Sequence, residues 1–231
     1  MKRNYFFVIA YILVPLFCFV QPCQADTFFD NFNDGNTDGW ISAPPSSNYG
    51  LGNWRVESGM LVQNLGGDHY KFLVENLPVS IQSIETLLST NDPAGYGGVT
   101  LWYQDPNNWV DVLIYPHGPP LLIIEIINGA PILSEYPYRY EDFTWYNFRV
   151  DANSLTGELA VSVDGNYLFT HVVTTDHRTG LSGLNSGNTG GNFDDFRLTS
   201  DDISPVPEPS TLLLLGSGLV GLIGFRRKIK K

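Results

Sequence analysis

The residues of this sequence best suited to acid–base chemistry are those with carboxylate side chains. Their spacing indicates whether two of them could act together on one bond. Hydrolysis of a glycosidic bond needs two carboxyl groups about 5 to 9.5 Å apart. The glutamates in or beside expected strands are Glu57, Glu75, Glu85, Glu125, Glu135, Glu141 and Glu158. None of them has an acidic residue two positions further on, where a side chain would share the same face of a strand. The sequence therefore favours a protein that is not an enzyme.

Glu125 stands alone in the apolar run Leu121–Ile127, between Ile124 and Ile126. Because successive side chains of a strand alternate, we predict that Glu125 points toward a ligand-binding face. A single carboxylate is more often a solvated strand residue, so hydrolysis of a glycoside at Glu125 is the less favoured alternative.

Aromatic residues gather in two neighbouring expected strands and suggest contact with sugars, whose apolar C–H faces stack on aromatic rings. Asp105, Asn107 and Asn108 lie in the turn between these strands and could orient hydroxyl groups. The ligand-binding residues that we predict are Trp102, Tyr103, Trp109, Tyr115 and Glu125. The alternative is that some of these rings belong to the hydrophobic core, where we also expect Trp40, Trp54 and Trp145.

Alternating oxygen ligands near the start of the domain match the first half of a calcium loop. The ligands that we expect for a structural calcium ion are Asp34, Asn36, Asp38 and, from near the other end of the chain, Asp195. Position twelve of the loop would be Pro45, where a calcium loop has a bidentate glutamate. The alternative is a turn rich in Asp and Asn that binds no ion.

Other catalytic chemistry finds little support in the residue types. The two cysteines, Cys18 and Cys23, both lie in a segment that we expect to be removed, which leaves no thiol for catalysis or zinc. The four histidines accompany no Gly-x-Ser-x-Gly nucleophile motif and form no His-x-x-x-His pair.

The first 25 residues have the pattern of a secretory signal peptide. A basic start is followed by an apolar run over 5–20 and by small residues before Asp26. We expect cleavage between Ala25 and Asp26, which defines residues 1–25 as signal peptide and 26–204 as the folded domain. The apolar run is short for a retained membrane helix.

The last 27 residues, 205–231, combine three features in order. Pro207, Glu208 and Pro209 are followed by a glycine-broken apolar stretch over 212–225 and by a basic cluster over 226–231. Together these features resemble the PEP-CTERM sorting signal. The resemblance implies that an exosortase processes the chain and that its source is a Gram-negative bacterium that makes extracellular polysaccharide. We expect a short helix in the inner membrane before processing, with the basic end in the cytoplasm, and then release to the cell surface or matrix.

Charge is distributed unevenly along the chain. Residues 26–204 hold 23 acidic and six basic residues, a net charge of −17, while seven of the 13 basic residues lie in the two ends. Such a surface repels nucleic acid. We therefore expect no nucleic-acid partner.

Short runs of aromatic and β-branched residues, separated by Gly, Pro, Asn and Asp, predict an all-β domain. The strands that we expect are 27–32, 54–57, 60–64, 70–75, 81–88, 98–103, 109–115, 121–127, 145–151, 159–163, 167–172 and 193–198. Asp164-Gly165 and Asn128-Gly129 are turn signals, and the first is typical of a type I′ hairpin. This pattern predicts a two-sheet antiparallel sandwich.

The order of strand and turn residues over segments 30–40, 53–61, 145–150, 161–165, 179–184 and 193–198 resembles the concanavalin A-like lectin/glucanase superfamily, particularly its laminin-G-like members. The resemblance implies a jelly roll with one concave sheet. Catalytic members carry Glu-x-Asp-x-x-Glu or Glu-x-Asp-x-Glu on one strand, and this chain has neither. We expect a non-catalytic protein that binds extracellular polysaccharide. The alternative is a structural or adhesive matrix protein without glycan specificity.

Overall fold

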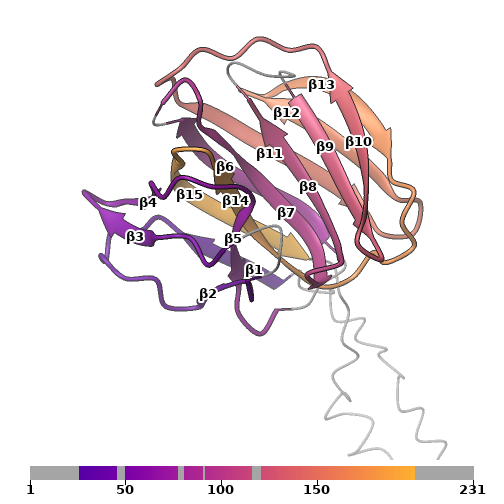
Figure 1. The fold of residues 1–231 in the computed structure, drawn as a ribbon, viewed down its shortest axis with the longest axis horizontal. Coiled ribbons are helices and arrows are strands. Elements are labelled where there is room, and N and C mark those ends of the chain that lie inside the picture. Colours follow the sequence, from indigo (N-terminus) through magenta and orange to yellow (C-terminus); the bar gives the residue numbers. More distant parts are fainter. Residues whose placement is uncertain (1–25, 46–49, 78–80, 91, 116–120, 201–231) are drawn as a thin grey trace, which may run out of the picture.

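A computed structural model describes residues 26–45, 50–77, 81–90, 92–115 and 121–200. The expected signal peptide, the C-terminal helix and the residues Pro207, Glu208 and Pro209 lie outside these ranges. Within them no helix is long and apolar enough to cross a membrane. The described residues form 15 strands in two antiparallel sheets, which face each other in Figure 1. The prediction of an all-β two-sheet sandwich is confirmed.

The eight-stranded sheet has the order β13-β12-β11-β6-β15-β4-β3, and β1 pairs with β15 beside this path. Its strands are β1 (Asp26–Asp30), β3 (Trp54–Glu57), β4 (Met60–Gln63), β6 (Ile81–Thr90), β11 (Tyr146–Asn153), β12 (Glu158–Val163), β13 (Asn166–Val172) and β15 (Gly191–Ser200). The first described strand lies against the last, with Asp26 opposite Ser200. Both ends of the described domain therefore lie at the same end of the sandwich, at the foot of Figure 1.

The seven-stranded sheet has the order β10-β9-β8-β7-β14-β5-β2. Its strands are β2 (Trp40–Ser42), β5 (Tyr70–Val74), β7 (Tyr96–Asp105), β8 (Asn108–Ile114), β9 (Leu121–Ile127), β10 (Ala130–Tyr136) and β14 (Leu181–Gly187). Each strand pairs antiparallel to its neighbour, and the central strands pair on both sides, with register shifts in β7 and β14.

The hydrophobic core fills the space between the sheets and follows from alternation along each strand. On β11, Phe148 and Val150 point into the core and are fully buried, while Arg149 between them points to solvent. The ring of Trp40 stacks on Phe72 at 5.1 Å, and Trp54 stacks on Phe72 from another side at 5.2 Å. Trp145, which we expected in the core, is 41% exposed.

Two-residue turns fix the register of three hairpins. Asp164 and Gly165, which join β12 to β13, both have positive φ angles, of 50° and 74°. Asn128 and Gly129, which join β9 to β10, have φ angles of 51° and 80°. Positive φ at both central residues defines a type I′ turn, so the prediction for Asp164-Gly165 is confirmed. Ser58 and Gly59 make a similar turn between β3 and β4.

Candidate functional site

The outer face of the seven-stranded sheet, the face turned away from the other sheet, carries a mixture of aromatic and charged side chains. On β8, Val110 and Val112 point into the core, and the alternate residues Trp109, Asp111 and Leu113 point outward. The outer face is nevertheless well covered, because Asp111 is fully buried and Trp109 is 4% exposed.

Asp111 is the centre of a buried hydrogen-bond network on this face. Its Oδ2 accepts hydrogen bonds from Lys71 Nζ on β5 and from Asn185 Nδ2 on β14, both at 2.6 Å. Its Oδ1 accepts a hydrogen bond from Thr100 Oγ1 on β7 at 2.7 Å. All four side chains are buried, so three neighbouring strands neutralise and orient one carboxylate.

Lys71 is the cation that makes a buried carboxylate tolerable at this position. Its Nζ also lies 3.6 Å from the centre of the Trp109 ring, a cation–π contact. Burial lowers the pKa of Lys71 to about 8, and the charge of Asp111 and its hydrogen bond oppose this shift. The two charges therefore stabilise each other in a place where either one alone would be costly.

His69 lies at the edge of the network with an unusual backbone conformation. Its φ angle is 54°, and its N–H donates to the hydroxyl of Tyr96 at 2.5 Å. The ring centre lies 5.7 Å from those of Tyr96 and Trp109, and Nδ1 lies 3.6 Å from Asp111 Oδ2. Both His69 Nδ1 and Asn185 Oδ1 are buried without a hydrogen-bond partner among the described residues.

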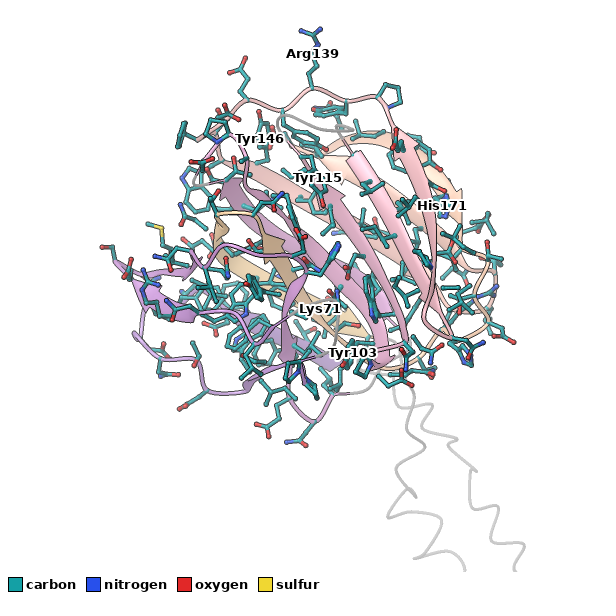
Figure 2. All side chains as sticks on the ribbon, in the orientation of Figure 1. Lys71, Tyr103, Tyr115, Arg139, Tyr146 and His171 are labelled. Atoms are coloured by element: carbon teal, nitrogen blue, oxygen red, sulfur yellow. The ribbon has the colours of Figure 1, made fainter. Side chains whose placement is uncertain are left out.

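Three of the predicted ligand-binding residues share this face. Tyr103, Trp109 and Tyr115 all pack in one cluster of the outer face, and Tyr115 stacks on Tyr96 at 4.5 Å. Figure 2 shows Tyr103 and Tyr115 toward opposite ends of the sheet, with Lys71 between them. Tyr103 is 5% exposed and Trp109 is 4% exposed, so both rings offer little surface to a ligand. Their role in binding stays a prediction.

Trp102 lies on the other side of the sheet, fully buried in the core. The register of β7 against β8 shifts between Leu101 and Asp105, and Trp102 has a φ angle of 52°. Such a bulge places two successive residues, Leu101 and Trp102, on one face and turns Tyr103 to the other. Alternation alone therefore gives the wrong relation between Leu101 and Trp102, and so the wrong face for Trp102.

Glu125 lies on the core side of β9 and is 1% exposed, which is opposite to the predicted orientation. Its carboxylate accepts hydrogen bonds from the N–H groups of Thr174 at 2.7 Å and Thr175 at 3.0 Å, and His171 Nε2 lies 3.4 Å away. Burial by itself raises the pKa of Glu125, but the hydrogen bonds from His171, Thr175 and Thr174 together hold that pKa below its usual value. Glu125 thus joins the segment after β13 to the other sheet.

The predicted calcium ligands occupy turns that their own side chains stabilise. Asp34 Oδ1 accepts a hydrogen bond from the N–H of Asn36 at 3.1 Å, and Asn36 Oδ1 accepts one from Asp38 at 2.7 Å. Asp195 lies on β15, beside Asp194, with a φ angle of 46°. No group of three or more His, Cys, Asp or Glu side chains within the described ranges is arranged to hold a metal ion. Calcium binding therefore stays a prediction.

The sequence did not single out the residues of the Asp111 network. The available signal was a charged residue in an otherwise apolar strand: Asp111 stands between Val110 and Val112, and Lys71 between Tyr70 and Phe72.

The fold belongs to a class of jelly-roll sandwiches that includes glucanases and carbohydrate-binding modules. The carbohydrate-binding module CBM66 from Bacillus subtilis superimposes with a TM-score of 0.60 at 15% identity, over 71% of this chain and 97% of that one. A β-1,3-1,4-glucanase (lichenase) from a mouse hindgut metagenome gives a TM-score of 0.56 at 12% identity, over 76% and 99%. The β-glucanase of Bacillus licheniformis gives 0.54 at 14% identity, over 75% and 97%.

Residues 205–228 match the PEP-CTERM protein-sorting motif, which confirms the resemblance of the C-terminal tail. The chain is therefore an exported protein that is anchored in the membrane before an exosortase processes it. None of the curated proteins matches the chain in sequence.

Proposed function

We propose that this chain is a non-catalytic carbohydrate-binding protein of the cell surface or extracellular polysaccharide matrix of a Gram-negative bacterium. The observation that carries the proposal is that both carboxylate oxygens of Asp111 are already occupied by hydrogen bonds within the protein. This carboxylate lies on the outer face of a glucanase-like sheet, yet both of its oxygens are engaged by Lys71, Thr100 and Asn185.

The absence of a catalytic partner on β8 supports the non-catalytic part of the proposal. Residues two apart on a strand lie about 7 Å apart on the same face, a separation that suits two glycosidase carboxylates. The two such neighbours of Asp111 are Trp109 and Leu113, which have no ionisable group. Glu125, the other candidate, is buried on the core side. One neutralised carboxylate supplies neither the acid nor the base of the reaction.

The carbohydrate part of the proposal is supported by the fold and by the destination of the protein. The similar structures include a carbohydrate-binding module and enzymes that act on β-glucans. The PEP-CTERM sorting motif adds support, because the tail resembles those of bacteria that make extracellular polysaccharide, and a domain delivered to their surface would meet glycans. The predicted calcium ion would serve the stability of the domain rather than the contact with sugar.

A binding and turnover experiment tests both parts. The full-length protein, kept in a sugar-free zwitterionic detergent, is applied to a glycan array and to immobilised β-1,3-glucan and β-1,3-1,4-glucan, with calcium and with EGTA. We expect retention on at least one neutral glycan and no release of reducing ends. Reducing ends released by the protein would overturn the non-catalytic assignment. Self-association on light scattering without retention on any glycan would replace carbohydrate binding by a structural role.

A further inference from the structure

An open depression runs across the outer face of the eight-stranded sheet, on the opposite side of the sandwich from Asp111. It consists of two hollows of about 560 and 580 Å³. Both are lined by Ser83, Arg149 and Thr199, so they adjoin and form one depression, which we call the Arg149 trough. One hollow extends over β11, β12 and β13, and the other extends over β6, β15 and β1.

The size of the outward side chains explains the shape of the trough. Space above the strands is left by short side chains, which include Ser83, Ala160 and Thr199. The longer side chains of Arg149 and Glu85 lie beside this space. All of them are positions that alternate with core residues, as Arg149 alternates with Phe148 and Val150. Small residues in the middle of the outer face thus account for the groove in this sheet.

Arg149 is held in place at the centre of the trough by two carboxylates. Its Nε donates to both oxygens of Asp151 at 3.0 Å, its Nη2 donates to Asp151 at 2.5 Å, and its Nη1 donates to Glu85 at 3.4 Å. Asn147 Nδ2 donates to the other oxygen of Glu85 at 2.8 Å. The side chains of Arg149, Asp151 and Glu85 remain 43%, 41% and 31% exposed. The three charges are therefore ordered and still accessible.

Such an arrangement matches the hydrogen-bonding capacity of sugar hydroxyl groups. A guanidinium group has five N–H donors, of which three are used within the trough, and the carboxylates keep free lone pairs. A hydroxyl group both donates and accepts, so neighbouring hydroxyls of one sugar ring can pair with the donors of Arg149 and the acceptors of Asp151 or Glu85 together. Because the side chains are already ordered, binding costs little side-chain entropy.

An aromatic ring provides the apolar part of the contact. Phe29 lines the end of the trough over β1 and is 48% exposed. The guanidinium group of Arg197 lies 5.2 Å from the centre of its ring and fixes its position. One ring at the end of a polar groove suits a sugar chain, whose rings have apolar C–H faces and polar edges.

The charge of the trough selects against acidic sugars. Arg149 and Arg197 are its cations, and Glu85, Asp151, Glu158 and Asp195 are its anions, a net charge of −2. The whole domain is acidic as well, at −17. A polysaccharide that carries carboxylates would be repelled.

We infer that the Arg149 trough binds a segment of a neutral polysaccharide. This inference rests on the proposed carbohydrate binding and assigns it to the face opposite Asp111, where side chains are accessible rather than covered. Asn147, Arg149, Asp151 and Glu85 hold the hydroxyl groups, and Phe29 stacks on a ring.

The test compares variants of the full-length protein in sugar-free detergent by calorimetric titration with soluble β-1,3-glucan and β-1,3-1,4-glucan. We expect Arg149→Ala to weaken binding at least about tenfold, because a charged hydrogen-bond donor is lost. Ala160→Ile, which fills the floor of the trough without changing charge, gives a similar loss. Arg55→Ala is the matched control: Arg55 pairs with Glu57 two residues away on the same sheet, outside the trough, and its loss leaves affinity unchanged. Thermal unfolding confirms that each variant is folded.

The outcomes separate the inference from the proposed function. If the wild-type protein binds and Arg149→Ala and Ala160→Ile bind equally well, the inference is wrong while carbohydrate binding stands. A loss of affinity in Tyr115→Ala alone would place the glycan on the Asp111 face instead. Binding of polygalacturonate as strong as that of the neutral glucans would contradict the charge selection. If the wild-type protein binds no glycan, the proposed function fails together with the inference.

Discussion

At the scale of single residues, the buried ion pair of Lys71 and Asp111 makes the clearest case for a contribution to stability. A buried charge without a partner destabilises a protein by several kcal/mol, whereas a buried pair replaced as a whole by neutral groups is often tolerated. Lys71 and Asp111 are both almost fully buried and lie 2.6 Å apart. Their contribution to stability is thus a property of the pair.

We expect Lys71→Met to lower the free energy of unfolding by about 3 to 5 kcal/mol, because Asp111 is left as an unpaired buried charge. Lys71→Met combined with Asp111→Asn should recover at least about half of that loss, since no charge then remains. Denaturation by urea at pH 7 measures both values. Arg55→Ala, which removes an exposed ion pair, is the control and should change stability by less than about 1 kcal/mol. Equal losses in the single and double variants would contradict this account.

Sequence patterns located several important side chains, but orientation depended on details that they do not contain. Tyr103, Trp109 and Tyr115 were predicted together as ligand-binding residues of neighbouring strands, and they share one face of the sheet. Trp102 was predicted on the wrong face of the sheet because nothing in the local sequence indicates the β-bulge. Glu125 was misplaced because β9 is apolar on both faces, so alternation could not tell the core side from the outer side.

Gly165 and Gly190 both lie in turns between strands, but they differ in the space available for a side chain. Gly165 has a φ angle of 74° with no atom within 4 Å of an added Cβ. Gly190, just before β15, has a φ angle of 92°, and an added Cβ would lie against the carbonyl oxygen of Gln63. Both positions need left-handed backbone, but only Gly190 lacks space.

Gly165→Ala should therefore cost about 1 to 2 kcal/mol, the price of a left-handed conformation for an L residue. Gly190→Ala should cost clearly more, because β4 and the start of β15 must also separate. Thermal unfolding of the two variants gives the comparison, in which Gly165→Ala serves as the control for conformation alone. A loss at Gly190 no larger than at Gly165 would mean that the turn before β15 adapts freely.

The elements that the sequence missed share a weak pattern. β10 is exposed along most of its length, and β14 reads Leu-Ser-Gly-Leu-Asn-Ser-Gly, with few large residues. β2 has only three residues. The residues of each of these strands give only a weak signal for β-structure. Pairing with the neighbouring strands of the sheet therefore determines that they form strands. The strongly apolar β8 and β9, by contrast, were predicted almost to the residue.

At the scale of the whole molecule, the sorting motif over 205–228 makes a prediction about the mature chain. We expect an exosortase to cut near Pro207, which removes the apolar stretch and five basic residues of the terminus. Intact-mass measurement of the protein from its native host should show neither residues 1–25 nor 212–231. The same protein from a host without an exosortase is the control and should keep its tail. An intact tail on surface-exposed protein in the native host would show a permanent anchor.

The position of β15 determines how the domain can carry mechanical load. The tail follows β15 directly, and β15 is not an edge strand: β6 pairs with it on one side, and β4 and then β1 pair with it on the other. A pull on the tail must therefore break hydrogen bonds on both sides of β15 at once, instead of peeling away one edge. The residues of the Arg149 trough lie on strands of this same sheet. Before processing, tension between a bound polymer and the anchored cell would thus run through one sheet, while the Asp111 face would lie outside the path of the load.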